Sequence, residues 1–230
     1  MIAPINPIGL GHLVFFGVCI PWAAWRSKVR LAASAMPSFR AHALQTILNL
    51  MVFGAFSLFV AYMEDITLLP PAMPPWRACV AGAVILILMI AIMRPRWRRA
   101  VEKRSRIVQF FMPSNASERM RWVAIALLAG ITEEITWRGV QFVLIFRLTH
   151  NALLAAILSA ASFSISHVMQ GWRGVLAVVP FALSFQLLAW LAGSLYVAMA
   201  VHFLYDLAAG LSYGKFGREL GYQPAPATPA

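Results

Sequence analysis

The chain has 230 residues, of which 61% are hydrophobic and only 12% are charged. A soluble domain carries about 25% charged residues, so this composition excludes an ordinary soluble domain and indicates an integral membrane protein. The formal net charge is +11. The basic residues lie between apolar runs rather than along an aromatic-rich face, which argues against nucleic acid as a partner.

The apolar runs predict an all-α, polytopic transmembrane helix bundle of about seven helices. Most runs approach the roughly 20 residues that cross the hydrocarbon core of a bilayer. They lack the two-residue alternation of barrel strands, so helices are favoured. The third and sixth runs are the shortest. In chain order the runs are 8–25, 43–63, 78–93, 121–146, 151–169, 174–190 and 193–213.

The first run is followed, not preceded, by basic residues. This is the reverse of a signal peptide and predicts a first helix whose N-terminus lies outside the cytoplasm. Cys19 and Cys79 lie inside apolar runs and are interpreted as small core residues. The histidines near the expected ends of spans are interpreted as interfacial or loop residues, namely His12, His42 and His150.

The distribution of Lys and Arg supports this topology. With seven spans, sixteen of the nineteen lie in expected cytoplasmic segments (26–40, 94–121, 173 and 215–218), two lie on the other side and Arg138 lies within a span. Such asymmetry is typical of the positive-inside rule and predicts a cytoplasmic C-terminus.

The segment 94–121 is the longest expected cytoplasmic connection, and we expect its basic residues to contact anionic lipid headgroups. Its apolar residues are compatible with one side of an interfacial helix, although a plain topology anchor is favoured; these residues are Trp97, Val101, Val108 and Met112. We expect residues 1–222 to form a single integral membrane domain. The Pro/Ala-rich tail 223–230 is expected to be disordered.

Six ionisable residues lie within the later spans: Glu133, Glu134, Arg138, His167, His202 and Asp206. A charge at the middle of a bilayer costs about 2.5–3.5 kcal/mol even on the lenient insertion scale. Such residues must therefore face one another or a wet cavity, and they indicate a functional site.

Spacing separates the two glutamates. Glu134 and Arg138 are four residues apart, so they share a helix face and are expected to form an ion pair. Glu133 points about 100° away from Glu134. It is therefore the expected reactive carboxylate, suited to act as a general base.

The same four-residue spacing relates Phe163 to His167 and His202 to Asp206. Two histidines and two acids from three helices would converge either to polarise a water molecule or to bind a divalent metal. The spacing is not that of zinc peptidases with two histidines on one helix, so a metal such as zinc stays an open alternative. Its ligands would be Glu133, His167, His202 and Asp206.

Three motifs in order resemble those of one family. Glu133-Glu134-Ile135-Thr136-Trp137-Arg138 matches EExxxR, Phe163-Ser164-Ile165-Ser166-His167 matches FxxxH, and His202-Phe203-Leu204-Tyr205-Asp206 matches Hxxx(N/D). In this order they resemble the CPBP family of CAAX-processing and bacteriocin-processing intramembrane proteases. The resemblance covers residues 121–213, the expected catalytic core.

The resemblance implies a cytoplasm-facing peptidase in which Glu133 and His167 activate the attacking water. His202 and the residue at 206 would stabilise the oxyanion, while Glu134 completes the catalytic set and Arg138 and Phe163 support it. Position 206 is Asp rather than Asn, and an ionised Asp would repel an oxyanion. Three roles for Asp206 therefore stay open: a protonated donor, a partner that orients His202, or a metal ligand.

The sequence thus predicts an intramembrane endopeptidase acting on a membrane-associated protein or peptide. The alternatives are a proton-coupled membrane transporter, because buried acids and histidines also form proton relays, and a non-catalytic immunity or scaffold relative. The substrate stays open among a prenylated protein, a bacteriocin leader and a sorting-signal tail. The family's distribution and the short loops favour a bacterial inner membrane.

Overall fold

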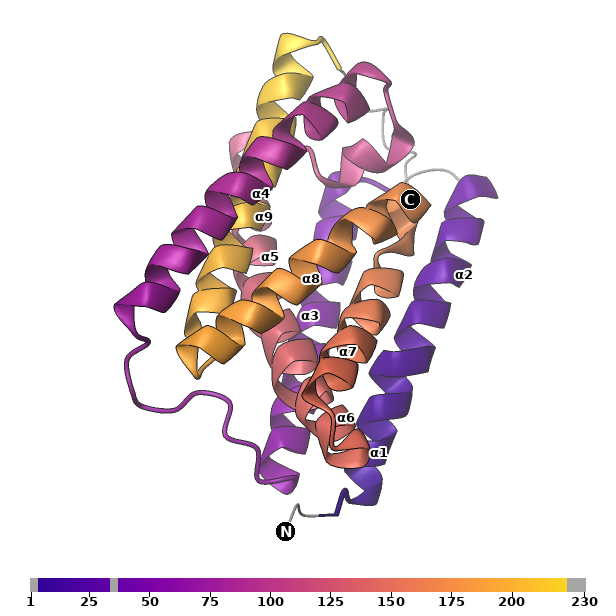
Figure 1. Ribbon diagram of the computed structural model, residues 1–230. Helices are drawn as coiled ribbons and strands as arrows, with labels where there is room; N and C mark the ends of the chain where they lie inside the picture. The colour runs from indigo at the N-terminus through magenta and orange to yellow at the C-terminus, as the bar shows by residue number, and fades with distance from the viewer. Residues whose placement is uncertain (1–3, 34–36, 223–230) are drawn as a thin grey trace.

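A computed structural model describes residues 4–33 and 37–222, and all the regular structure in them is helical (Figure 1). The helices join into seven continuous segments within this part of the chain, which confirms the expected all-α fold. The predicted disordered tail, 223–230, lies outside the described residues. The segments are α1–η1–α2 (Pro7–Val14, Phe15–Cys19, Ile20–Ala33), α3 (Phe39–Met63), α4 (Trp76–Glu102), α5–η3–α6 (Ala116–Glu133, Glu134–Gln141, Phe142–Thr149), α7 (Ala152–Ser166), α8 (Trp172–Ala192) and α9 (Tyr196–Glu219), with short 3₁₀ turns η2 (Arg106–Phe110) and η4 (Val168–Gln170).

Local sequence signals fix where many of these helices begin. A side-chain oxygen at the N-cap accepts a hydrogen bond from a backbone N–H of the first turn, which satisfies one of the donors that a helix start leaves unpaired. Asn6, Ser38, Asn115 and Asn151 play this part for α1, α3, α5 and α7. Gly193, with φ of 62°, ends α8.

Four helical stretches are long and apolar enough to cross a membrane: Pro7–Leu31, Phe39–Met63, Trp76–Glu102 and Trp172–Ala192. The third and sixth spans, expected to be the shortest, have 27 and 21 residues, whereas α7 has only 15. Large apolar side chains are exposed along these helices, as lipid-facing residues are; examples are Leu48, Val52, Val84 and Ile87. Cys19 and Cys79 are also exposed, so their expected placement in the core is wrong.

Helices α5 and α9 pack directly on one another, and α9 also contacts α4 and α8. Gly130 makes the approach possible. A Cβ atom there would lie 2.8 Å from the backbone nitrogen of Phe203 and 3.0 Å from the backbone oxygen of Met199. Small residues commonly allow such close approach between helices in membranes. The contact brings the helix that ends at Glu133 against the helix that carries His202.

The segment 94–121 does not form the interfacial helix that was the less favoured alternative for it. Helix α4 continues through Pro95 to Glu102, and a 3₁₀ turn follows at Arg106–Phe110. The four apolar residues of this segment do share a face, but it is buried against Ala209 and Phe216 of α9; they are Trp97, Val101, Val108 and Met112. They pack inside the protein because α9 extends beyond the apolar run that marked its expected end.

Candidate active site

The first motif lies where an α-helix changes into a π-helix. Glu133 is the last residue of α5 and Glu134 is the first residue of η3. A π-helical turn inside an α-helix is rare and is frequent at functional sites. The two glutamate side chains differ in burial, because that of Glu134 is fully buried whereas that of Glu133 is 18% exposed, and they approach different nitrogens of the same His202 ring.

One carboxylate oxygen of Glu134 contacts two partners, Arg138 and His202. Its Oε1 lies 3.3 Å from Nη1 of Arg138 and accepts a 2.7 Å hydrogen bond from Nδ1 of His202. The expected ion pair with Arg138 therefore forms. The bond to His202 was not expected, because it joins residues 68 positions apart in the chain.

Aromatic rings enclose the guanidinium of Arg138. Its Cζ atom lies 4.1 Å from the centre of the Phe163 ring and 5.3 Å from that of Phe185. The Phe185 ring also stacks on the imidazole of His202, with centres 4.8 Å apart. Phe163 and Phe185 thus both contact Arg138, and Phe185 lies outside the three motifs.

His202 is oriented toward two carboxylates. With Nδ1 bound to Glu134, its Nε2 lies 3.7 Å from Oε2 of Glu133 and 3.6 Å from Oδ2 of Asp206. Trp122 holds the backbone at Asp206 by donating a 2.9 Å hydrogen bond from Nε1 to its carbonyl oxygen. The three carboxylates of the site, Glu133, Glu134 and Asp206, therefore surround one imidazole.

His167 follows the last residue of α7 and is fixed by its own helix. Its Nδ1 donates to the carbonyl oxygen of Phe163 at 2.9 Å, because a carbonyl oxygen only accepts. This bond leaves Nε2 as the nitrogen available for proton transfer. The Phe163 ring contacts the imidazole, with centres 4.5 Å apart.

One cavity of about 320 Å³ is lined by Glu133, His167, His202 and Asp206 together. The rest of its wall is mainly aromatic and apolar, including Trp97, Trp122, Phe163, Phe185 and Tyr213. His42, near the start of α3, also lines this cavity and stacks on Phe110 with ring centres 4.0 Å apart. A hollow of this kind with a few convergent polar groups is typical of an active site.

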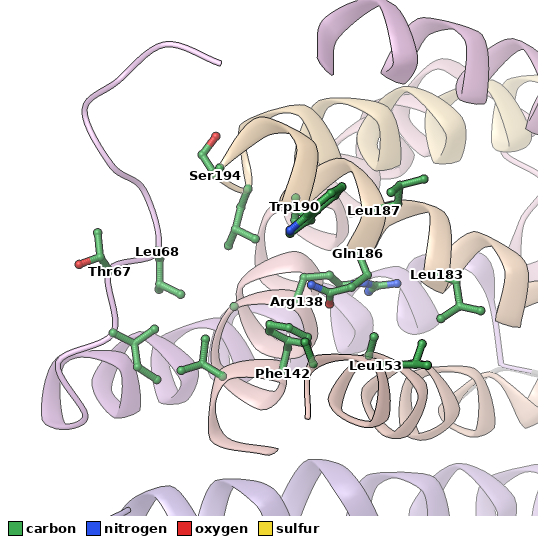
Figure 2. Close-up of a pocket in the computed structure, with 18 residues that line it drawn as sticks. Thr67, Leu68, Arg138, Phe142, Leu153, Leu183, Gln186, Leu187, Trp190 and Ser194 are labelled. Atoms are coloured by element: carbon green, nitrogen blue, oxygen red, sulfur yellow. The ribbon is translucent and has the colours of Figure 1, made fainter. Parts of the chain in front are cut away.

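A second cavity, of about 610 Å³, is lined by Arg138, which does not line the first (Figure 2). Arg138 and Gln186 are among its polar lining residues, together with apolar side chains such as Leu183, Leu187 and Trp190. None of its described lining residues is a carboxylate or a histidine. We therefore take the smaller cavity as the candidate active site. Arg138 and its aromatic neighbours, Phe163 and Phe185, separate the two cavities.

The arrangement does not fit a metal ion. Among residues 4–33 and 37–222, no group of three or more His, Cys, Asp or Glu side chains is placed to hold one. The chemistry below therefore uses protein side chains alone.

Serine residues on α7 hold the π-helical turn from one side. Ser159 donates from Oγ to the backbone oxygen of Trp137 at 2.7 Å, and Ser162 accepts from Trp137 Nε1 and Gln141 Nε2. These serines lie outside the three motifs and were not predicted as site residues. The pattern that could have indicated them is the three-residue spacing of small polar residues, which places them on one face of an apolar helix.

The fold and the site define a class: a multi-helix protein with several apolar helices of membrane-spanning length, and with carboxylates and histidines gathered in one cavity. Residues 115–208 match the family described as type II CAAX prenyl endopeptidase, Rce1-like, and the chain carries a domain of that family over this range. The family is one of intramembrane proteases. Comparisons with curated proteins and with solved structures found no match.

Proposed function

We propose that the protein is an intramembrane endopeptidase that hydrolyses a peptide bond in a membrane-associated protein or peptide. One observation carries the proposal: Glu133, His167, His202 and Asp206 line a single cavity between helices of membrane-spanning length. The matched family supports a protein or peptide substrate.

In the proposed reaction Glu133 is the general base. It removes a proton from a water molecule, whose oxygen forms a bond to the carbonyl carbon of the scissile peptide. His167 assists through Nε2, the nitrogen that its bond to Phe163 leaves available. Glu133 then passes the proton to the amine nitrogen as the C–N bond breaks, which yields a carboxylate and an amine.

His202 is proposed to stabilise the oxyanion of the tetrahedral intermediate. Its Nδ1–H donates to Glu134, so Nε2 is the nitrogen that faces the cavity acids. In the protonated form Nε2–H donates to the developing negative charge. Asp206, 3.6 Å from this nitrogen, is assigned to orienting His202 and supporting its protonated form rather than to contacting the oxyanion.

The cavity is proposed to face the cytoplasm. Residues of the α4–α5 connection and of the turn after α7 line it, and Ile107, Phe110 and Met169 are examples. This end of the bundle also carries the exposed arginines of the α4 tail, such as Arg94, Arg96 and Arg99. The positive-inside rule assigns such an end to the cytoplasm, where these side chains contact anionic lipid headgroups.

The test is cleavage of a library of membrane-associated peptides by the purified protein in lipid vesicles, in water enriched in ¹⁸O. Hydrolysis predicts one ¹⁸O atom in each new C-terminal carboxylate, with cleavage that persists after chelation. Loss of cleavage on chelation would overturn the metal-independent mechanism. An intact library throughout would overturn the peptidase proposal, and proton flux into the same vesicles would then identify a transporter.

A further inference from the structure

A buried chain of polar side chains connects the N-terminal helix to the first motif. Nε2 of His12, on α1, lies 3.1 Å from Oγ of Ser57 on α3. The same oxygen lies 2.9 Å from Oγ1 of Thr136, which in turn is 2.7 Å from the backbone oxygen of Thr132. His12, Ser57 and Thr136 are each fully buried, so the expectation of an interfacial His12 is wrong.

The direction of this chain follows from its last acceptor. The carbonyl of Thr132 only accepts, so the hydroxyl of Thr136 donates to it. The contact between the two hydroxyls then requires Ser57 to donate to Thr136. Ser57 has no second hydrogen, so Nε2–H of His12 donates to Ser57. The histidine is the only group that supplies a hydrogen to the chain without receiving one from it.

The chain ends at the peptide group that joins Thr132 to Glu133. Thr136 itself belongs to η3 and lies midway between Glu134 and Arg138 in the sequence. A hydroxyl that bonds to the carbonyl four residues earlier commonly bends a helix. The bonds from Ser57 and Thr136 therefore act on the turn that carries both glutamates.

Two features of packing hold α1 and α3 in place for this contact. A Cβ atom at Gly54 would lie 2.7 Å from Cγ2 of Thr132, so the absent side chain lets α3 approach the turn closely. The imidazole of His12 packs against the rings of Phe16 and Phe56, with centres 4.6 and 5.6 Å away. The ring is thereby held with Nε2 toward Ser57.

We propose that His12 and Ser57 are positioning residues for the active site. They contact none of Glu133, His167, His202 and Asp206 among the described hydrogen bonds, and they lie outside the family match at 115–208. They act through Thr136 and Thr132 on the turn that carries Glu133 and Glu134. The consequence for catalysis rests on the proposed peptidase function, whereas the consequence for site geometry does not.

The experiment compares His12→Phe, which keeps a packed ring but removes the donor, with His12→Gln, which keeps a donor at similar reach. Ser57→Ala removes the next bond with little change in volume. Thr149→Val is the matched control, because Thr149 makes the same bond to the carbonyl four residues earlier, at 2.9 Å to Ile145, in α6. Each variant is measured for peptide cleavage and for the ¹⁵N signals of selectively labelled histidines.

We expect His12→Phe and Ser57→Ala to lower kcat by about ten- to hundredfold with KM little changed. A misplaced catalytic group slows the chemical step but does not prevent the protein from binding its substrate. Both should shift the Nδ1 signal of His202, which reports its bond to Glu134. His12→Gln should restore both quantities, and Thr149→Val should alter neither. In the unmodified protein His12 should show the Nε2–H tautomer.

Three results would overturn the proposal: a Nδ1–H tautomer at His12, an unchanged His202 signal in His12→Phe and Ser57→Ala, or loss of kcat that His12→Gln does not restore. A library left uncleaved by the unmodified protein would instead contradict the peptidase function. The His202 signal would still decide whether the two residues position the site.

Discussion

At the scale of single residues, Glu134 shows how a buried carboxylate is retained in an apolar interior. Its Oε1 meets both Arg138 and Nδ1 of His202, and the guanidinium is further covered by the Phe163 ring. Breaking a buried pair by removing one partner leaves an uncompensated charge, which costs more than the pair itself contributes. We therefore propose that Glu134 holds the geometry of the site and that Glu133 transfers the proton.

This assignment predicts that Glu134→Gln destabilises the fold. Arg138 would lose its counter-charge while 4% exposed, and the expected loss in free energy of unfolding is about 3–5 kcal/mol. Glu102→Gln is the control, because Glu102 pairs with Arg98 where both side chains are largely exposed; such pairs contribute about 0–1 kcal/mol. Thermal unfolding in lipid measures both variants, and equal melting temperatures would contradict the assignment.

The residues of the site could be predicted from local spacing only in part. The four-residue interval between Glu134 and Arg138 predicts their pair, and the offset of Glu133 predicts its different direction. The bond from His202 to Glu134 depends on how α9 packs against α5, which no local pattern specifies. His12 was misjudged for the same reason, since its partner Ser57 lies 45 residues away.

At the scale of elements, the contact between α5 and α9 assembles the site. Each helix contributes one side: Glu133 at the end of α5, and His202 and Asp206 on α9. Gly130 lies against the backbone of Phe203 and Met199, which has little room to move aside. The hydrophobic runs predicted both helices, but periodicity alone does not reveal the π-helical turn that follows α5 or the close approach at Gly130.

Gly130→Ala should therefore separate α5 from α9. We expect a loss of about 1–3 kcal/mol in the free energy of unfolding, as is usual when a methyl group is forced into a packed core, and a lower cleavage rate. Gly11→Ala is the matched control, since a Cβ atom there has nothing within 4 Å. Equal stability and equal cleavage in the two variants would show that the α5–α9 contact does not need a glycine.

The length of α4 was underestimated from the sequence for a clear physical reason. The apolar run ends near residue 93, where the arginines begin, yet the helix continues to Glu102. Beyond the membrane-spanning part, Trp97 and Val101 bury one face on α9 while Arg98 and Glu102 pair on the exposed face. The length of an apolar run indicates only the part of a helix that crosses the lipid, and not the length of the whole helix.

At the scale of the whole molecule, the helices alternate between two ends (Figure 1). The connection from Met63 to Trp76 lies at one end, and the α4–α5 connection, with its many basic residues, lies at the other. The proposed cavity opens among residues of the basic end. Under the proposed function, this basic end is the one that faces the cytoplasm.

Thiol labelling tests this orientation. In a background without Cys19 and Cys79, we expect Met73→Cys to react with a membrane-impermeant reagent in intact cells, because Met73 is 89% exposed in the connection before α4. Lys103→Cys, after α4, should react only once the membrane is permeabilised. The opposite pattern would place the cavity on the outer side and contradict the proposed orientation.

The central claim is that Glu133 activates water for peptide hydrolysis. Its most direct test is the cleavage rate of Glu133→Gln beside the unmodified protein, with Glu102→Gln as a control that also removes one carboxylate. The account predicts at least about a hundredfold loss for Glu133→Gln, the lower range for general acid–base catalysis, with Glu102→Gln unaffected. Cleavage by Glu133→Gln at the unmodified rate would contradict the account.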